Sequence, residues 1–363
     1  MGRSIVINLI LLEYYVSASN ILIWNPAIAQ SHVNFLGNIA DVLTADGHNV
    51  TIFSPAIDPL LTTFGNRLPA RTIRYGSKSA KGVQEMEIRA SALWESPPCA
   101  GVCFKWSDYD IMYEETLRYC KDLLEDEDMI KALNESKFEL AYVESFDTCA
   151  PGIFQILGIK SMVMVSAFGM LPRMYEIMGM LHLPSFMPES YTPFSDNMTF
   201  LERLTNFRVH LKMMLHMRHW DGVFWEVFNV KYPGFPAIQE IYNEKACLIM
   251  ANVNEFAETP RPKTNMIVYV GGSTLYDSKA LSKHWDKVLN ERSATVLFSL
   301  GTIALSKDMP AWLKNDIIET FASFPNVTFI WKYEDDDTSL FAGHKNIHPV
   351  KWVPQYDLLE SSQ

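Results

Sequence analysis

Short, continuously apolar runs alternate with amphipathic segments along this sequence, and the alternation leaves few folds open. Residues 20–25 form the first run and end at Pro26, which is typical of a strand buried on both faces of a parallel sheet. Residues 32–45 place their apolar side chains on one helical face, and Gly47 follows in the position of a helix cap. The next apolar run covers residues 49–53. Strand, helix and strand in such close succession predict a βαβ unit.

The same alternation continues and falls into two blocks, which predicts an α/β protein with two open domains. Further helices are expected over residues 113–133, 150–157, 280–289 and 312–324, further strands over 138–143, 161–165, 247–252, 266–270, 295–300 and 327–331, and a loop over 348–352. The polar segment 257–264 is the predicted linker between a first domain, 19–256, and a second domain, 265–363. The second block is the shorter one, and its alternation is still in progress where the sequence ends.

The composition excludes two classes of protein. Hydrophobic residues make up 48% of the 363 residues, which is too apolar for a disordered chain. The 42 acidic and 31 basic side chains give a net charge of −11, whereas a nucleic-acid-binding surface needs positive charge to neutralise phosphates. Nucleic acid is therefore not an expected partner.

The N-terminus has the pattern of a secretory signal peptide. Arg3 precedes a mostly apolar run over residues 5–16, and small residues up to Ala18 form a cleavage site. Residues 1–18 are therefore expected to be a signal peptide. Glu13 interrupts the apolar run, so a buried first strand is the alternative. No other stretch approaches the roughly 20 apolar residues that a membrane-spanning helix needs.

The cysteines and the glycosylation sequons fit an oxidising compartment. The number of cysteines, 5, is odd, so at least one thiol is expected to be free. Cys99 and Cys103 lie in a proline-rich loop, where a local disulfide is expected. A zinc site there is disfavoured, because no second Cys or His pair follows at the spacing of a zinc finger. Asn134 and Asn197 begin sequons in polar segments and are the expected glycosylation sites.

The region 199–229 is rich in methionine and aromatic residues and is expected to be one long helix. Its apolar side is wide, and basic residues are interspersed along it. Two interpretations stay open for this region. It is either a core helix under a long loop, or a helix that contacts a membrane surface or covers a lipophilic substrate.

His32 is the first candidate catalytic residue. It follows the first strand at the start of the first helix, and open α/β sheets bind ligands at the carboxyl ends of their strands. A neutral imidazole there can take a proton from a substrate hydroxyl near pH 7. A general base of this kind gains from a carboxylate that orients the ring. Glu144 and Asp147, which follow the strand at 138–143, are the candidates for that partner.

Two segments of the second block are candidate ligand sites. Ser299, Gly301 and Thr302 follow a predicted strand, where exposed backbone N–H groups suit a phosphate. Trp352 and Gln355 lie further along, and an exposed Trp can stack on a nucleobase while a Gln amide pairs with its edge. Neither pattern is specific by itself, because tight strand-to-helix turns and packed Trp-x-Pro turns look similar.

The order and spacing of these segments resemble those of the UDP-glycosyltransferase family, and within it the animal, nematode-like UDP-glucuronosyltransferases. The matching stretches are Ser31-His32, Leu43-x-x-x-Gly47-His48-x-Val50-Thr51, the run 138–149 with its Glu144, Asp147 and Cys149, Ser299-Leu-Gly-Thr302, and Trp352-Val-Pro-Gln355-x-Asp-Leu-Leu359. The resemblance covers essentially the whole chain in the family's order.

The resemblance implies a GT-B fold, in which two Rossmann-like domains face each other across a cleft. It implies that the first domain holds the acceptor, with His32 as the general base. The family's partner carboxylate is an Asp, and Glu144 occupies the matching position, so Asp147 stays open as a substitute. The resemblance further implies a UDP-sugar site in the second domain. Ser299, Gly301 and Thr302 would lie at the diphosphate, Trp352 would stack on uracil, and Gln355 would bond to the uridine.

The activity implied by the resemblance is inverting transfer of glucuronic acid or glucose from a UDP-sugar to the hydroxyl of a small lipophilic acceptor. No metal is expected, and the expected compartment is the lumen of the endoplasmic reticulum. The family's His-x-Gly-Gly stretch and its membrane anchor do not follow Gln355, so a truncated chain is expected. The alternative function is that of a non-catalytic member that binds lipophilic ligands or forms oligomers with full-length relatives.

Three rival classes are disfavoured by the residues present or absent. An esterase would need Gly-x-Ser-x-Gly, and a nicotinamide enzyme would need Gly-x-Gly-x-x-Gly after the first strand; neither occurs. Residues 335–337, three consecutive aspartates, would suit a metal-dependent transferase but are expected in a solvated loop. His344 and His348 have ligand spacing only in a helix, and their flanking Gly343 and Pro349 favour a loop.

Overall fold

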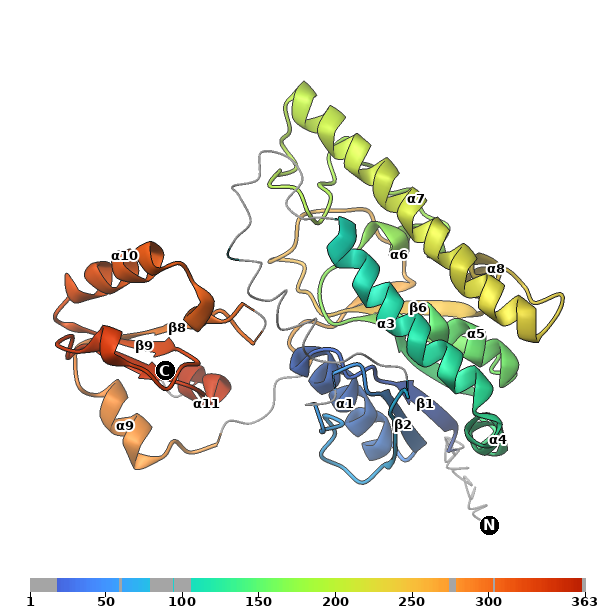
Figure 1. The fold of residues 1–363 in the computed structure, drawn as a ribbon, viewed down its shortest axis with the longest axis horizontal. Helices are drawn as coiled ribbons and strands as arrows, with labels where there is room; N and C mark the ends of the chain where they lie inside the picture. Colours follow the sequence, from blue (N-terminus) through green and yellow to red (C-terminus); the bar gives the residue numbers. More distant parts are fainter. Residues whose placement is uncertain are drawn as a thin grey trace, which may run out of the picture.

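The computed structural model describes residues 18–58, 61–78, 94, 106–273, 279–302 and 304–360. These residues form a parallel sheet of seven strands, in the order β3-β2-β1-β4-β5-β6-β7, and a second sheet of three strands, in the order β10-β9-β8. Figure 1 shows the two sheets in separate bodies, with the second body in orange and red. The predicted α/β class with two blocks is confirmed.

The strands of the first sheet are mostly the apolar runs predicted from the sequence. They are β1 (Asn20–Trp24), β2 (Asn49–Pro55), β3 (Arg71–Tyr75), β4 (Leu140–Glu144), β5 (Ser161–Ser166), β6 (Ala246–Ala251) and β7 (Ile267–Tyr269). β3, which contains two arginines, is less buried than the central strands and was not predicted. The central strands are continuously apolar because helices cover both of their faces.

The two faces of the first sheet pack against different helices. Ile21 and Ile23 of β1 face α1 (Gln30–Ala45), whereas Leu22 and Trp24 face the larger core on the other side. That second face is covered by α3 (Trp106–Glu125), α4 (Glu127–Glu135), α5 (Cys149–Ile156), α6 (Pro172–Ile177), α7 (Phe200–Lys231) and α8 (Ile238–Lys245). Alternate residues of one strand therefore belong to two separate hydrophobic cores.

The strand order reverses between β1 and β4. β1 pairs with β2 on one side, with Ile23 beside Ile52, and with β4 on the other, with Ile23 beside Tyr142. The connections from these two strands leave in opposite directions, which opens a crevice at their carboxyl ends. Ligand-binding residues are therefore expected just after Trp24 and Glu144.

Two boundaries in the first sheet differ from the sequence prediction. The helix expected over 113–133 is broken at Asp126, whose side chain accepts a hydrogen bond from the backbone N–H of Met129 and caps α4. The strand expected at 266–270 in the second block pairs with β6 as β7, because a neighbouring strand edge is available there. The first sheet thus continues beyond the segment 257–264; the domain division itself stays a prediction.

A disulfide that the sequence analysis did not foresee joins two helices of the large core. Cys120 of α3 and Cys149 of α5 are bonded, with their Cα atoms 5.7 Å apart. Cys247 of β6 is a free and exposed thiol. Cys99 and Cys103, for which a local disulfide was predicted, lie outside the described residues.

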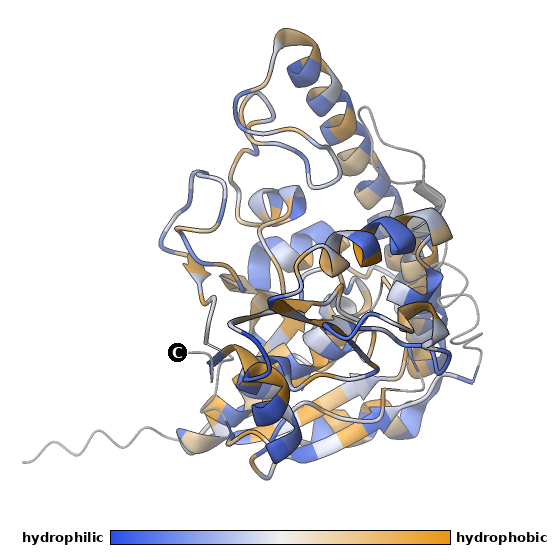
Figure 2. Ribbon diagram, turned by 90° about the vertical axis from the view of Figure 1, so that its left-hand side faces the viewer, coloured by the Kyte–Doolittle hydropathy of each residue, from blue (hydrophilic) through white to orange (hydrophobic). Residues whose placement is uncertain are grey.

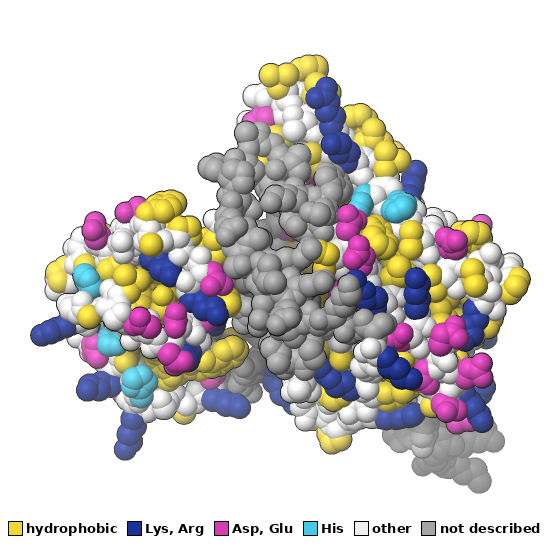
Figure 3. Space-filling model, viewed as in Figure 1, with side chains coloured by type: hydrophobic (Ala, Val, Ile, Leu, Met, Phe, Trp, Pro, Cys, Tyr) yellow, Lys and Arg dark blue, Asp and Glu magenta, His cyan; other side chains and the backbone are white. Residues whose placement is uncertain are grey.

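The helix α7 combines a buried half and a projecting half. Towards its C-terminal end Trp220, Phe224 and Phe228 belong to the large core. Towards its N-terminal end Val209 and Met213 belong only to a small separate cluster. Figure 2 shows hydrophobic and hydrophilic residues mixed around this helix, and Figure 3 shows hydrophobic side chains at its projecting end. The exposed ones are Phe200, Leu201, Leu204, Phe207, Leu211 and Leu215.

The second sheet is smaller and has its own core around Trp331. Its elements are α9 (Lys283–Leu289), β8 (Ala294–Phe298), α10 (Ala311–Ala322), β9 (Val327–Lys332), β10 (Ile347–Val350) and α11 (Gln355–Glu360), with short 3₁₀ turns at Ser306–Asp308 and Ser339–Phe341. The loop predicted over 348–352 is wrong in its first part, because Ile347–Val350 pairs with β9. Pro349 is tolerated in that strand because β10 is an edge of the described sheet.

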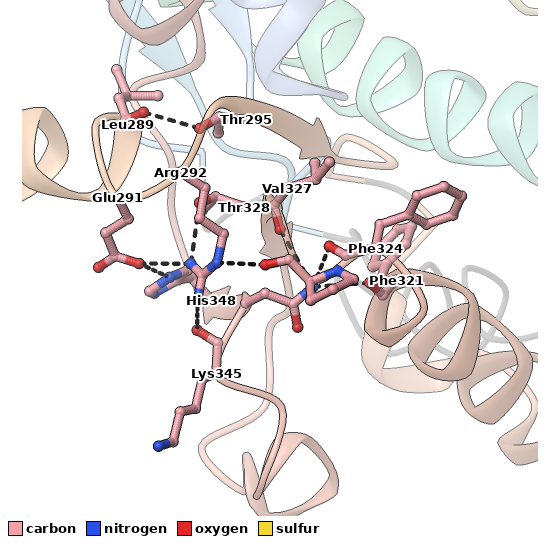
Figure 4. A network of polar contacts seen from close by, with 12 residues as sticks. Leu289, Glu291, Arg292, Thr295, Phe321, Phe324, Val327, Thr328, Lys345 and His348 are labelled. Carbon is pink, nitrogen blue, oxygen red and sulfur yellow. Dashed lines mark hydrogen bonds and ion pairs between the residues drawn. The ribbon is translucent and has the colours of Figure 1, made fainter.

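Arg292 ties together the amino ends of the second sheet's strands (Figure 4). Its guanidinium donates hydrogen bonds to the Lys345 carbonyl at 2.9 Å, the Thr328 hydroxyl at 3.3 Å and the Glu291 carboxylate at 3.0 Å. The same Glu291 oxygen lies 2.9 Å from Nε2 of His348. Because the Arg292 side chain forms hydrogen bonds with three separate segments, its loss should destabilise the whole sheet.

We predict that Arg292→Ala lowers the free energy of unfolding of the second sheet by about 1–3 kcal/mol, since it leaves several polar partners unmatched. The measurement is urea unfolding followed by tryptophan fluorescence. Lys345→Ala is the matched control: it removes a basic side chain at the same place but leaves the carbonyl that Arg292 contacts. Equal effects of the two variants would mean that charge, not the hydrogen-bond network, stabilises this end.

Candidate active site

His32 and Glu144 meet at the crevice where the strand order reverses. His32 lies in the first turn of α1, directly after β1, and Glu144 is the last residue of β4. Nδ1 of His32 is 3.1 Å from Oε2 of Glu144. Glu144 is completely buried, while 14% of the His32 side chain is exposed. The pairing of β1 with β4 therefore brings a nearly buried imidazole against a buried carboxylate.

The second oxygen of Glu144 also has a fixed partner. Oε1 accepts a hydrogen bond of 3.1 Å from the backbone N–H of Ala167, the residue that follows β5. A buried carboxylate is tolerated only when its oxygens are hydrogen-bonded. Three neighbouring strands, β1, β4 and β5, thus place the group that orients His32.

Two phenylalanines enclose the His32 ring. Phe146 and Phe168 contact it edge to face, at centroid distances of 5.4 and 5.6 Å. With the ring held in this way and Nδ1 against Glu144, Nε2 is the nitrogen left for a substrate. An ionised Glu144 accepts hydrogen bonds only, so we assign the proton of the neutral imidazole to Nδ1 and the lone pair to Nε2.

Asp147 lies in a different environment, although it is only three residues beyond Glu144. Its carboxylate accepts hydrogen bonds from Nε1 of Trp24 at 2.9 Å, from the Tyr119 hydroxyl, and from the backbone N–H groups of Cys149 and Ala150 at 3.0 Å each. Burial raises the pKa of this carboxyl, and the hydrogen bonds from Tyr119, Ala150, Trp24 and Cys149 act in the opposite direction. Asp147 therefore caps α5 and binds core side chains, whereas the contact with His32 belongs to Glu144.

The residues predicted for the UDP-sugar site lie at the carboxyl ends of strands in the second sheet. Ser299, Gly301 and Thr302 follow β8, and the Ser299 hydroxyl accepts a 3.3 Å hydrogen bond from the Gly301 N–H. Gly301 has a φ of +83°, which a residue with a side chain adopts only with strain. Trp352 follows β10 with 66% of its surface exposed, and Gln355 begins α11. The two segments thus follow strands on either side of β9.

The rival metal sites considered from the sequence do not form in the described residues. Asp336 pairs with Lys351, and Asp337 accepts a 2.9 Å hydrogen bond from the Ser339 N–H, so the aspartates make an exposed and internally bonded loop. His348 lies on β10 against Glu291 instead of facing His344 on a helix. Neither group brings three ligands together.

Comparison with solved structures supports the fold class. A glycotransferase of kitacinnamycin superposes with a TM-score of 0.58 at 16% identity, over 94% of this chain and 73% of that chain. The spinosyn forosaminyltransferase SpnP gives a TM-score of 0.55 at 15% identity, over 95% of this chain and 74% of that chain. At these identities the likeness concerns the fold alone, and that fold is the GT-B arrangement of glycosyltransferases.

The family follows from sequence comparison. The family model described as UDP-glucoronosyl and UDP-glucosyl transferase matches residues 19–362, and the chain belongs to that family. The Caenorhabditis elegans protein ugt-56, whose name places it among the UDP-glucuronosyltransferases, is 30% identical over 96% of this chain and 66% of its own length. The mouse UDP-glucuronosyltransferase 1A9 is 23% identical over 91% of this chain and 61% of its own length. The chain thus spans about two thirds of such relatives.

Of the helices in the described residues, none combines the length and the apolar character needed to cross a bilayer. One half of α7 lies in the core and the other half projects with exposed apolar residues, and contact of that half with a membrane surface or a lipophilic substrate stays a prediction.

We predict that Asp147→Ala lowers the free energy of unfolding by about 3–5 kcal/mol. The substitution leaves the Trp24 N–H and the Tyr119 hydroxyl buried without an acceptor and removes the cap of α5. Chemical denaturation measures the effect. Asp128→Ala, at an exposed position of α4, is the control and should change stability by less than about 1 kcal/mol. An Asp147→Ala protein as stable as the control would refute the structural role of Asp147.

Proposed function

We propose that this protein transfers a sugar from a UDP-sugar to the hydroxyl of a small lipophilic acceptor, with inversion at the anomeric carbon. The observation that carries the proposal is the contact between His32 and the buried Glu144 at the reversal of strand order. Membership of the UDP-glycosyltransferase family supports the class of donor.

In the proposed reaction His32 acts as the general base. The acceptor hydroxyl gives its proton to Nε2 as its oxygen attacks the anomeric carbon, and the bond from that carbon to UDP breaks with the electron pair leaving on the diphosphate. One displacement inverts the configuration. The ring becomes an imidazolium, whose charge the adjacent Glu144 carboxylate stabilises.

Glu144 replaces the Asp expected at this position, and its extra methylene has a use in this chain. Starting from the end of β4, the longer side chain contacts both His32 and the N–H of Ala167. We therefore assign the orienting role to Glu144. Asp147, the alternative considered from the sequence, has its hydrogen-bonding capacity taken by the core.

The substrates follow from the surroundings of the two sites. Phe146 and Phe168 beside His32 favour an apolar acceptor that carries a hydroxyl. For the donor we assign Ser299, Gly301 and Thr302 to the diphosphate, and Trp352 and Gln355 to the uridine. Glucuronic acid and glucose are the sugars we propose. No metal takes part in this reaction scheme.

We also propose that the protein enters the secretory pathway. The support is the signal-peptide pattern of residues 1–18 and the disulfide between Cys120 and Cys149, a bond that forms in oxidising compartments. Asn134 and Asn197, both exposed, are the proposed glycosylation sites.

We predict that His32→Ala in the full-length protein lowers kcat/KM for transfer to phenolic acceptors by about 10²–10⁴, the usual contribution of a general base. UDP-sugar binding should be unchanged. Glu144→Gln should also lower kcat/KM substantially, because the imidazolium loses its counter-charge. The measurement is sugar transfer from UDP-glucuronic acid and UDP-glucose, followed by chromatography.

His48→Ala is the matched control, since this histidine lies at the opposite end of α1 and should leave turnover unchanged. Turnover by His32→Ala equal to that of the parent protein would sink the general-base assignment. A large loss for Asp147→Asn at unchanged stability, with none for Glu144→Gln, would move the orienting role to Asp147. A protein that binds acceptors and UDP-sugar without any transfer would instead fit the non-catalytic alternative.

A further inference from the structure

Three metal-ligating side chains converge beside α7, apart from the proposed active site. They are His182 and Glu189, in the segment between α6 and α7, and His210, in the third turn of α7. Their ligand atoms all lie within 4.8 Å of one another. Within the described part of the chain this is the one such group of three.

A single oxygen of Glu189 lies between the two imidazoles. Oε1 is 2.7 Å from Nδ1 of His210 and 3.4 Å from Nδ1 of His182. Ligand atoms of a tetrahedral ion with bonds of about 2.0–2.1 Å are about 3.4 Å apart. The separation between His182 and Glu189 already has this value. The two rings lie nearly parallel with centroids 4.9 Å apart, and the 2.7 Å between Nδ1 of His210 and the Glu189 oxygen would have to lengthen on an ion.

His182 is buried without a hydrogen-bonding partner for either ring nitrogen. Its side chain is 3% exposed, and neither Nδ1 nor Nε2 makes a hydrogen bond. One of these nitrogens is a donor and the other an acceptor in a neutral ring, so both are costly to bury unmatched.

The segment that carries Glu189 is held in place independently of any ion. Asn206, fully buried on α7 one turn before His210, donates to the carbonyls of Pro184 at 2.8 Å and Met187 at 2.9 Å. Its own oxygen accepts from the N–H of Glu189 at 2.8 Å. The backbone at Glu189 is thereby fixed against α7, the helix that carries His210.

The local charge also suits a divalent cation. Imidazole binds metal ions as the neutral ring, so the Glu189 carboxylate is the charge that this group of ligands offers to a cation. Arg261 is the cation whose charge reaches His182, and its guanidinium is paired with Glu258 at 3.0 Å and bonded to the Met170 carbonyl at 2.9 Å. Its repulsion of a bound cation is therefore reduced.

We propose that His182, Glu189 and His210 bind one Zn²⁺ ion, with water in the fourth position. Two imidazoles with one carboxylate suit zinc, whereas Mg²⁺ and Ca²⁺ require mainly oxygen ligands. The ion would fasten the segment 182–189 to the projecting half of α7. In the structure that half is supported by a small apolar cluster of Val209, Met213 and Met217 with Tyr191.

The test starts from full-length protein stripped with a chelator and then freed of it. Calorimetric titration with ZnCl₂ should show one site, and Zn²⁺ should raise Tm. CoCl₂ should give the intense visible bands of four-coordinate Co²⁺. His210→Ala and Glu189→Gln should each weaken Zn²⁺ binding by at least about 100-fold. His219→Ala, at an exposed histidine of the same helix, is the control for surface binding and should change nothing.

The proposal is overturned if the stripped parent protein binds no Zn²⁺, or if its Co²⁺ spectrum is that of a six-coordinate aqua ion. It is also overturned if His210→Ala and Glu189→Gln bind Zn²⁺ as the parent does. Circular dichroism and Tm of the stripped variants show whether they fold. If they do not fold, the Co²⁺ spectrum of the parent protein decides alone. None of these measurements depends on sugar transfer, so the outcome is independent of the proposed function.

Discussion

The contact between the His32 imidazole and the Glu144 carboxylate depends on one feature of topology. β1 and β4 are adjacent and their connections diverge, so the residues that follow them face a common crevice. β5 then supplies the Ala167 N–H for the other Glu144 oxygen. A carboxylate with no exposed surface needs partners for both of its oxygens, and the contact of one of them with Nδ1 orients the His32 ring.

Two carboxylates three residues apart have separate tasks. Glu144 ends a strand and reaches into the crevice, whereas Asp147 turns into the core and joins Trp24 of β1, Tyr119 of α3 and the start of α5. The disulfide between Cys120 and Cys149 fastens the same two helices. The hydrogen bonds of Asp147 and this disulfide therefore fix the position of the end of β4, from which Glu144 extends.

The sequence predicts those parts of the fold that depend on local pattern. The continuous apolar runs predicted the central strands. The position of His32 after the first of these strands predicted that it lies at the crevice. The pattern could not separate Glu144 from Asp147, because both follow one strand and only tertiary packing distinguishes them. Nor could it show that β7 joins the first sheet, that Asp126 breaks a helix, or that Cys120 meets Cys149. The cluster of His182, Glu189 and His210 was missed because its spacing matches no ligand motif; only the packing of a loop on α7 assembles it.

The most direct test of the central claim is the protonation state of the His32 ring. Two-bond ¹⁵N–¹H correlation spectra of ¹⁵N-histidine-labelled protein distinguish the two neutral tautomers, and His32→Ala identifies the signal. We predict that neutral His32 carries its proton on Nδ1, facing Glu144, with Nε2 unprotonated, and that Glu144→Gln abolishes this preference. A parent protein whose His32 carries the proton on Nε2, or whose tautomer is unaffected by Glu144→Gln, would contradict the arrangement of base and carboxylate on which the proposed function rests.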